Sequence, residues 1–527
     1  MISGFSLTRT INLAEGIFEW LKLFLWFVFL LVACLILARH KAGILFLTRS
    51  VILTALTLSF VGICQYFQIA FNAIPGNYAI CATMANKNLF ASALFLMLPF
   101  ILFGVLLFSG DWFRLSTVAL TGVLYAIAIS ETRAVWGAIL ISTALTVLLV
   151  FLQYKKLKLT PNEKHFYLRR TLLIAAIFVL SCSAGIWPHF TGNTSVSLAF
   201  IQPDGAELEN LAFPSRPITA LGSLNERMLL WRKTLRMIKD SPVLGVGLGQ
   251  WRIVWPSYGM IHKLAPFGDG QREIWFQRPH NDFLWVCSET GVFGLLGYLL
   301  YWGVLICYAW RIISNSKDTP NKIFAILMLF GIIGFAIISC LAFPKERIFH
   351  GLFFVLVAGS VVSIYHAQFP IHKPMTPGKI FGLNIVLLFL LIFGLVDGHA
   401  RFQAEMHTKN ALAARQSKDW RQVIVEIDKA DTGYYSLDPT STPLSWYRGM
   451  ARFAMGQIKE ALEDFQTAYN CHPYHIHVLN NLGTCNARLK DYAKAIAHYQ
   501  TALALSPDFQ EAQLNLRRLY FRMAKFG

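Results

Sequence analysis

Charged residues are scarce in this sequence. Only 14% of the 527 residues are Asp, Glu, Lys or Arg, whereas 55% are hydrophobic. A soluble globular protein has about 25% charged residues, so the composition excludes that class and indicates a membrane protein with many spans. The sequence also has no CxxC pair, and most of its nine cysteines lie inside apolar runs. Neither a zinc site built on paired cysteines nor a disulfide framework is therefore indicated.

Acidic residues are fewer than basic ones. The 29 Asp and Glu residues against 47 Lys and Arg residues give a formal net charge of +18. The basic residues concentrate in short segments that flank apolar runs, at 39–49, 155–170 and 311–322. Such clusters are typical of loops that stay on the cytoplasmic side of a membrane. We therefore assign them to orientation in the membrane and do not expect nucleic-acid binding.

Apolar runs long enough to cross a hydrocarbon core of about 30 Å recur through the first three-quarters of the chain. The first run does not look like a cleaved signal peptide, so we expect it to remain. With ten spans the three basic loops share the cytoplasmic side, and both chain ends lie outside. The predicted spans lie near 16–38, 48–70, 88–109, 114–130, 134–153, 171–188, 282–310, 322–343, 350–367 and 378–398.

A polar, helical segment follows the last span, and it contains a repeat. WYRGMARFAMGQIKEALEDFQTAYNCHP is followed 34 residues later by NNLGTCNARLKDYAKAIAHYQTALALSP. This register pairs Gly449 with Gly483 and Pro473 with Pro507. The spacing resembles the tetratricopeptide repeat, in which small residues allow two helices to pack closely. Such a module serves either packing alone or the binding of a protein partner.

These patterns predict an all-α protein with two parts. The first is a polytopic membrane bundle of about ten spans over residues 1–400, with a large external loop over 189–281. The second is an α-solenoid of tetratricopeptide repeats over residues 401–527. Membrane lipids surround the first part in this prediction.

Polar residues gather at the external surface in this topology. In ISETRAVWGAIL, Arg133 stands at the outer end of the fifth span beside Glu131. It either binds an anion or is an interfacial arginine paired with Glu131. SLNERMLLWRKTLRMIKDSP predicts an amphipathic helix that lies on the membrane or covers a cavity, with basic residues such as Arg227 toward anions. Its predicted apolar face consists of Leu224, Met228, Trp231, Leu235 and Ile238.

Two further stretches complete this outer set. VLGVGLGQW places glycines at alternate positions, which is not the GxGxxG dinucleotide fingerprint and instead indicates a tight turn or a close backbone approach. RPHNDFLWVCSETGVFGLLGYLL, residues 278–300, opens an apolar helix that Asn281 or Asp282 can cap. His280 lies just outside that cap, and imidazole is suited to accept a proton near neutral pH. A single histidine at a helix start is, however, more often structural.

The order of these stretches resembles the O-antigen ligase and polymerase superfamily of bacterial envelope glycosyltransferases. PHNDFLWVCSETGVFGL matches the family's His-Asn, Glu-x-Gly and Gly pattern, and ANKNLFASALFLMLP, which contains Asn88, resembles its upstream helix. The resemblance covers roughly residues 85 to 398, and repeats like these occur on some members. Six predicted spans precede the large loop, which is fewer than members usually carry. We therefore expect the N-terminal part to be divergent or incomplete.

The resemblance implies transfer of a glycan from a polyprenyl-pyrophosphate carrier to an acceptor hydroxyl at the external face of the bacterial cytoplasmic (inner) membrane. One guanidinium group can donate two parallel hydrogen bonds to phosphate oxygens. Arg133 and Arg227 are therefore predicted to hold the pyrophosphate. His280 is the predicted base. The attack is expected to be direct, with no metal and no cofactor. The predicted supporting residues are Asn281, Glu289 and Asn88.

Several alternatives stay open at this point. The acceptor is a lipid A core, another glycan unit or a protein side chain, and the last would make this a protein O-oligosaccharyltransferase. A transporter of lipid-linked sugars predicts polar residues through the depth of several spans, whereas here they gather at one face. A noncatalytic scaffold for the repeats predicts that Arg133, Arg227 and His280 are dispensable.

Overall fold

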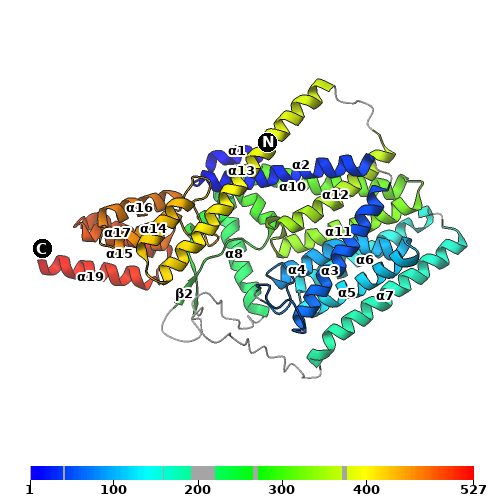
Figure 1. Cartoon of the computed structure of the whole chain (residues 1–527), viewed down its shortest axis with the longest axis horizontal. Coiled ribbons are helices and arrows are strands. Elements are labelled where there is room, and N and C mark those ends of the chain that lie inside the picture. The colour runs from blue at the N-terminus through cyan, green and yellow to red at the C-terminus, as the bar shows by residue number, and fades with distance from the viewer. Residues whose placement is uncertain are drawn as a thin grey trace. The chain divides into compact units, whose positions relative to one another are not determined.

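The structure is a computed structural model of the chain, and it describes residues 2–39, 42–76, 78–157, 159–190, 220–264, 271–370 and 377–526. Parts of the predicted external loop, 191–219 and 265–270, lie outside the described residues, and so does the side chain of Leu224. The described residues are mostly helical, with one short β-hairpin (Figure 1).

Ten of the described helices are long and apolar enough to cross a membrane, by length and composition. They coincide with the ten predicted spans, so the predicted multi-pass, all-α fold is confirmed. These helices are α2 (Leu13–Arg39), α3 (Gly43–Tyr66), α4 (Lys87–Leu107), α5 (Gly110–Ser130), α6 (Arg133–Leu157), α7 (Pro161–Phe190), α10 (Asp282–Asn315), α11 (Thr319–Leu341), α12 (Ile348–Gln368) and α13 (Pro377–Gln416).

The chain divides into two compact units, and each is described by itself. Unit 1 holds Met1–Leu25, Glu226–Tyr298 and Met375–Gly527, and unit 2 holds Trp26–Asn225 and Leu299–Pro374. Unit 1 therefore contains the start of α2, most of the described large loop, the first turns of α10 and the repeats. Unit 2 contains most of the other candidate spans.

Unit 2 is built around α4, whose side chains are almost all buried. Helices α3, α5, α11 and α12 pack against α4. Aromatic rings fill much of the interface with α11, where the rings of Phe95 and Phe330 have centroids 5.4 Å apart. One polar tie crosses to α12: a ring nitrogen of buried His350 lies 2.8 Å from Ser92 Oγ and 3.0 Å from the Leu89 carbonyl oxygen. This pairing satisfies a polar group that would otherwise be costly to bury.

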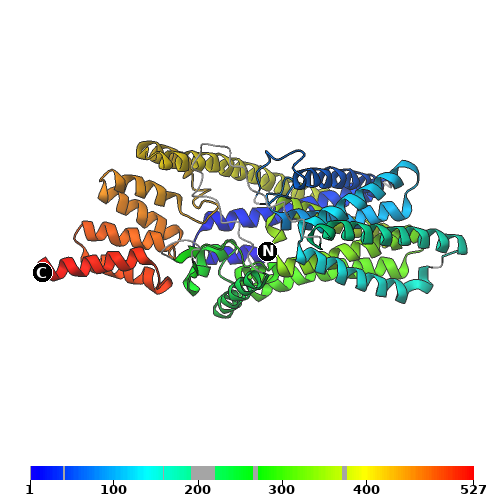
Figure 2. The ribbon, with the colours of Figure 1, turned by 90° about the horizontal axis from the view of Figure 1, so that it is seen from below.

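The repeats in unit 1 stack as antiparallel helix pairs, as Figure 2 shows for the orange and red helices. The predicted small residues explain the close packing: a Cβ added to Gly449 would lie 2.8 Å from the Phe465 ring, and one added to Gly483 would lie 2.6 Å from the Tyr499 ring. The predicted tetratricopeptide solenoid is thus confirmed. Its helices are α14 (Trp420–Ala430), α15 (Leu444–Ala454), α16 (Ile458–Cys471), α17 (Ile476–Arg488), α18 (Tyr492–Leu505) and α19 (Gln510–Phe526).

The described part of the large loop forms short elements. Helix α8 (Ala220–Asp240) leads to the glycine-rich stretch, and α9 (Trp251–Val254) and the 3-10 helix η2 (Trp255–Tyr258) follow. The antiparallel strands β1 (Ile261–Leu264) and β2 (Gln271–Ile274) then lead toward α10. This hairpin was not predicted from the sequence. The remaining short helices are α1 (Ile2–Ser6), η1 (Leu7–Arg9) and η3 (Pro344–Glu346).

Helix α8 is present as predicted, but its most buried side chains lie beside the predicted apolar face. Leu230, Thr234 and Met237 are buried, whereas Met228 and Leu235 are exposed. The predicted apolar face packs only in part, since its Trp231 and Ile238 are half-buried. Both faces carry residues three or four positions apart, so periodicity alone could not select between them.

Candidate functional site

The start of α10 holds His280 in a fixed backbone position. Asn281 caps the helix, because its Oδ1 accepts a hydrogen bond from the Leu284 amide at 2.9 Å. His280 itself has φ 56°, in the left-handed region that few residues other than glycine adopt. The indole of Trp231 on α8 donates to the carbonyl oxygen of Pro279 at 2.9 Å. The histidine is thus placed between a helix cap and an anchor from α8.

Burial and the positive charges of two arginines lower the pKa of His280. Arg227 lies one turn before Trp231 on α8, so its side chain leaves the same face of that helix. Arg278 precedes His280 by two residues. Burial, and then the positive charges of Arg227 and Arg278, lower the pKa of His280 to about 3. The imidazole is therefore neutral near pH 7 and can accept a proton.

Of these groups, the sequence analysis assigned roles to Arg227 and His280, and the structure brings them together. It gave no role to Arg278, although its place two residues from His280 was a usable signal. Burial also lowers the pKa of Arg227, which stays far above neutral pH and leaves the guanidinium charged. Two cations and a neutral base in one place form a site suited to an anionic substrate with a proton to lose.

The helix α10 is broken at Gly291, which has φ 69° and ψ −171°. The glycine-rich stretch docks across this break. The Val246 amide donates to the Ser288 carbonyl at 2.9 Å, the Gly247 amide to the Glu289 carbonyl at 3.1 Å, and the Val292 amide to the Pro242 carbonyl at 2.8 Å. Backbone pairing of this kind explains why the break in α10 needs the loop beside it.

A close backbone approach was predicted for the alternate glycines, and Gly245 shows why. Its φ is +70°, and an added Cβ would lie 2.4 Å from the carbonyl carbon of Glu289. No side chain fits there without movement of one backbone segment. The prediction of a close approach is confirmed at this residue.

Glu289 ties the same loop to α10 through its side chain. Its carboxylate is 1% exposed and accepts a hydrogen bond from the Trp251 amide at 3.1 Å. The Trp251 indole in turn donates to Thr234 Oγ1 on α8 at 3.1 Å. Glu289, named from the sequence as a supporting residue, thus contacts the backbone of the loop. Helices α8 and α10 are thereby held to one common loop.

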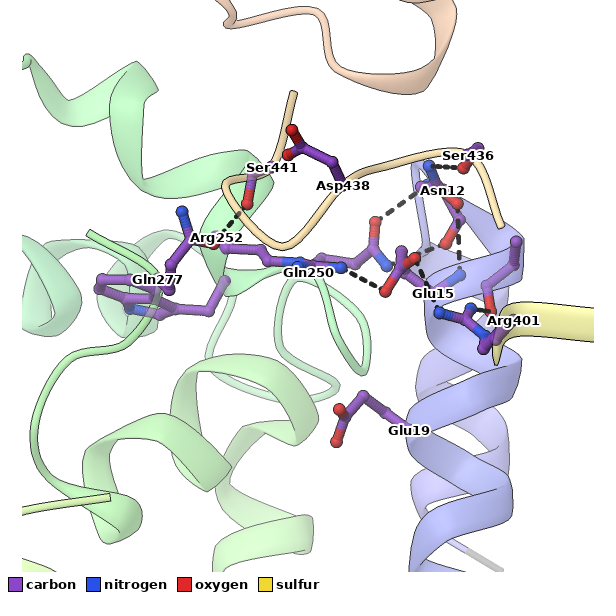
Figure 3. A network of polar contacts seen from close by, with 12 residues as sticks. Asn12, Glu15, Glu19, Gln250, Arg252, Gln277, Arg401, Ser436, Asp438 and Ser441 are labelled. Carbon is purple, nitrogen blue, oxygen red and sulfur yellow. Dashed lines mark hydrogen bonds and ion pairs between the residues drawn. The ribbon is translucent and has the colours of Figure 1, made fainter. Parts of the chain in front are cut away.

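A buried polar network fixes this loop to the start of α2 (Figure 3). Gln250 accepts from the Asn12 amide at 2.9 Å and donates to the Asn12 carbonyl at 3.0 Å. Arg252 pairs with one carboxylate oxygen of Glu15, and Arg401 Nη1 on α13 lies 3.2 Å from the other. Two guanidinium groups thus compensate a carboxylate that is only 3% exposed. The sequence analysis did not single out this network, because its members lie hundreds of residues apart.

The remaining predicted residues, Arg133 and Asn88, belong to unit 2. Arg133 is the first residue of α6 and is exposed. Its neighbour Glu131 lies 3.8 Å from Lys87, so the start of α4 meets the turn between α5 and α6. Asn88 is exposed there, and its amide donates to Asn86 Oδ1, the cap of α4, at 2.8 Å. Both residues thus lie at one end of unit 2.

The described residues were also compared with the requirements of a metal site, which needs several ligand side chains close together. No group of three or more His, Cys, Asp or Glu side chains lies close enough together there to hold a metal ion. The site is therefore described by its arginines and its histidine.

The fold and the site together define a multi-pass membrane protein with a repeat module and with a loop that brings arginines and a histidine to the start of one helix. Comparison with protein families agrees with this class. Residues 118–299 match the family model for O-antigen ligase, and residues 440–508 match that for the tetratricopeptide repeat. The matches confirm the predicted resemblance to the O-antigen ligase and polymerase superfamily with C-terminal repeats. A search of curated proteins finds no match to the chain.

Proposed function

We propose that this protein is a membrane glycosyltransferase that moves a glycan from a polyprenyl-pyrophosphate carrier to an acceptor hydroxyl. The observation that carries the proposal is the placement of Arg227 and Arg278 near enough to His280 for their charges to lower its pKa, inside the segment that matches O-antigen ligase. Arginine stays charged at every physiological pH and binds phosphate oxygens through two N–H groups at once. It is therefore suited to a pyrophosphate leaving group.

In the proposed reaction, His280 takes the proton of the acceptor hydroxyl as that oxygen attacks. The new bond joins the acceptor oxygen to the anomeric carbon of the glycan, and the bond from that carbon to the phosphate oxygen breaks. Polyprenyl pyrophosphate leaves with the electron pair, and Arg227 and Arg278 stabilise its charge. Attack is direct, as in the family, and no covalent sugar intermediate forms.

The donor itself makes His280 a better base. In the free protein burial, and after it the charges of the two arginines, hold the pKa of His280 at about 3. A bound pyrophosphate neutralises those cations and adds negative charge, which raises the pKa of His280 toward the pH at which the enzyme works. Proton transfer is thus coupled to occupancy of the donor site.

Arg133 is proposed to contribute a third cation to the donor site, and Asn88 to support it. Both are exposed at the same end of unit 2, where they are accessible to a ligand. Arg133 also begins α6, and the start of a helix favours anions through its free amide groups.

We also propose that the site and the repeats lie on the external, periplasmic side of the inner membrane. Asn12 at the start of α2 contacts Gln250 of the large loop, and its side chain donates to Ser436 Oγ of the repeat region at 2.8 Å. These contacts support one common side for the N-terminal end, the loop and the repeats. The basic segments 39–49, 155–170 and 311–322 fall on the opposite side in the predicted topology and support its assignment as the cytoplasm.

The proposal is tested with the full chain purified into lipid nanodiscs. The protein is incubated with an undecaprenyl-pyrophosphate oligosaccharide and, separately, with a lipid A core, a glycan acceptor or a serine-containing protein. We expect one acceptor to gain the mass of the oligosaccharide, with one undecaprenyl pyrophosphate released per product. Movement of the donor across a proteoliposome without a new bond would favour a transporter, and inactivity in both assays would favour a scaffold.

A further inference from the structure

The segment that leads into His280 is attached to the repeats. We call residues 275–280 the strap. Successive side chains of an extended segment point to opposite sides, and the strap uses this alternation. The ring of Trp275 stacks on His475 of the repeats, with centroids 4.5 Å apart and an interplanar angle of 20°. Phe276 instead packs edge-on against Trp255 of the large loop, with centroids 5.9 Å apart.

Gln277 makes the second attachment to the repeats. Its Nε2 donates to the Thr440 carbonyl at 2.9 Å, and its Oε1 accepts from Ser441 Oγ at 2.6 Å, as Figure 3 shows for the latter pair. Both functions of the amide are therefore used. This two-point contact lies three residues before His280, so little backbone separates it from the proposed base.

The partner turn on the repeats is itself rigid. The carboxylate of Asp438 is 3% exposed and accepts from the Thr440 amide at 2.8 Å and from the Thr442 amide at 2.9 Å. Its second oxygen accepts from the Tyr447 hydroxyl on α15 at 2.7 Å. The turn that holds Gln277 is thus fixed to the first helix of a repeat. A displacement of α15 therefore acts on the strap.

We propose that the repeat domain positions His280 for the reaction through the strap, with Trp275 and Gln277 as positioning residues. The inference rests on the proposed function of His280 as the base. The repeats are then a part of the catalytic unit, beyond any partner that they bind. The repeats hold the start of the strap, and Trp231 and the Asn281 cap hold its end, so the backbone position of His280 depends on both attachments and shifts when the first is lost. A displacement of about 1 Å costs a reaction about 100-fold in rate.

The test compares Gln277→Ala with Gln466→Ala in the full chain in nanodiscs. Gln466 is an exposed glutamine on α16, and its only described side-chain bond is one of 3.4 Å to Asn470. We expect Gln277→Ala to lower kcat by about 10- to 100-fold while the Kd for the donor changes by less than about twofold, since Arg227 stays in place on α8. Gln466→Ala should keep the wild-type kcat. An unchanged kcat in Gln277→Ala would overturn the inference.

Trp275 gives an independent check by conservative rescue. Trp275→Phe keeps an aromatic ring for His475 and should retain most of kcat, whereas Trp275→Ala should lose it as Gln277→Ala does. Equal kcat values for the two Trp275 variants would contradict the positioning role.

Hydrogen exchange separates failure of this inference from failure of the proposed function. Gln277→Ala should raise the exchange rate of amides in residues 275–284 by about tenfold or more, because the strap is released from the repeats. This readout does not depend on transfer. If His280→Ala proved active, the proposed function would fail, and with it the positioning of a base, whatever the exchange rates. If His280→Ala is inactive but exchange and kcat in Gln277→Ala match wild type, the inference alone fails.

Discussion

The Gly291→Ala substitution should release the glycine-rich loop from α10. Gly291 has φ 69° and ψ −171°, a region that costs other residues about 1 to 3 kcal/mol. Its Cβ would also lie 2.0 Å from the Val243 carbonyl oxygen, so backbone must move. That movement breaks the hydrogen bonds of the Val246, Gly247 and Val292 amides, each worth about 1 kcal/mol. Loss of these three bonds is therefore expected to cost about 3 kcal/mol, and a chain that kept the Gly291 dihedral angles instead would bear about 1 to 3 kcal/mol of strain in addition to the clash.

Gly297→Ala, six residues later in the same helix, is the matched control. Nothing lies within 4 Å of its added Cβ, so alanine is expected to favour the helix by about 0.5 to 1 kcal/mol. Hydrogen exchange of residues 242–251 and glycan transfer are measured for both variants. Gly291→Ala should expose the loop amides and lose transfer, whereas Gly297→Ala should do neither. Equal behaviour of the two variants would refute the docking of the loop as a requirement for activity.

Further outcomes follow from the charges and from the topology. Arg133→Lys and Arg227→Lys should each lower kcat/KM by about tenfold or more, because an ammonium loses the paired hydrogen bonds; equal activity would contradict phosphate binding. Lys459→Cys, exposed on the repeats, should react in spheroplasts with a thiol reagent that cannot cross the inner membrane, and labelling only after lysis would reverse the topology. Burial lowers the pKa of His472 to about 3 and that of His475 well below its usual value, so stability is lost as the pH falls below about 6.5. At pH 5 the loss from His472 is about 2 kcal/mol, and a Tm of the repeats that is unchanged between pH 7 and pH 5 would contradict it.

The membrane fold was predictable because each membrane span requires a long run of apolar residues, which is visible in the sequence. The repeats were predictable for a related reason: Gly449 and Gly483 recur at the 34-residue period, and each makes room for an aromatic ring on the neighbouring helix. Both signals are local and periodic. Helix α8 shows the limit of periodicity, since the exposed Met228 and the buried Leu230 both fit helical patterns and only tertiary packing decides between them.

The candidate site was predictable in its central residues and not in its surroundings. His280 and Arg227 lie in recognisable motifs, and the structure brings them together. Arg278 stands two residues before His280, which was a usable signal, but it was given no role in the prediction. Contacts such as those of Gln250 with Asn12 and of Gln277 with Ser441 join segments more than 150 residues apart, with |i−j| of 238 and 164. No spacing rule connects such pairs, because the chain brings them together only after it folds.

The identity of the base is the central claim, and His280→Ala tests it most directly. His399→Ala is the control, since His399 is an exposed histidine on α13 of the same unit. Product is quantified by mass spectrometry under saturating donor and acceptor, and donor binding is measured alongside. The account predicts that His280→Ala binds the donor, remains folded and forms no product above background, while His399→Ala matches wild type. Product from folded His280→Ala protein at the wild-type rate would contradict it.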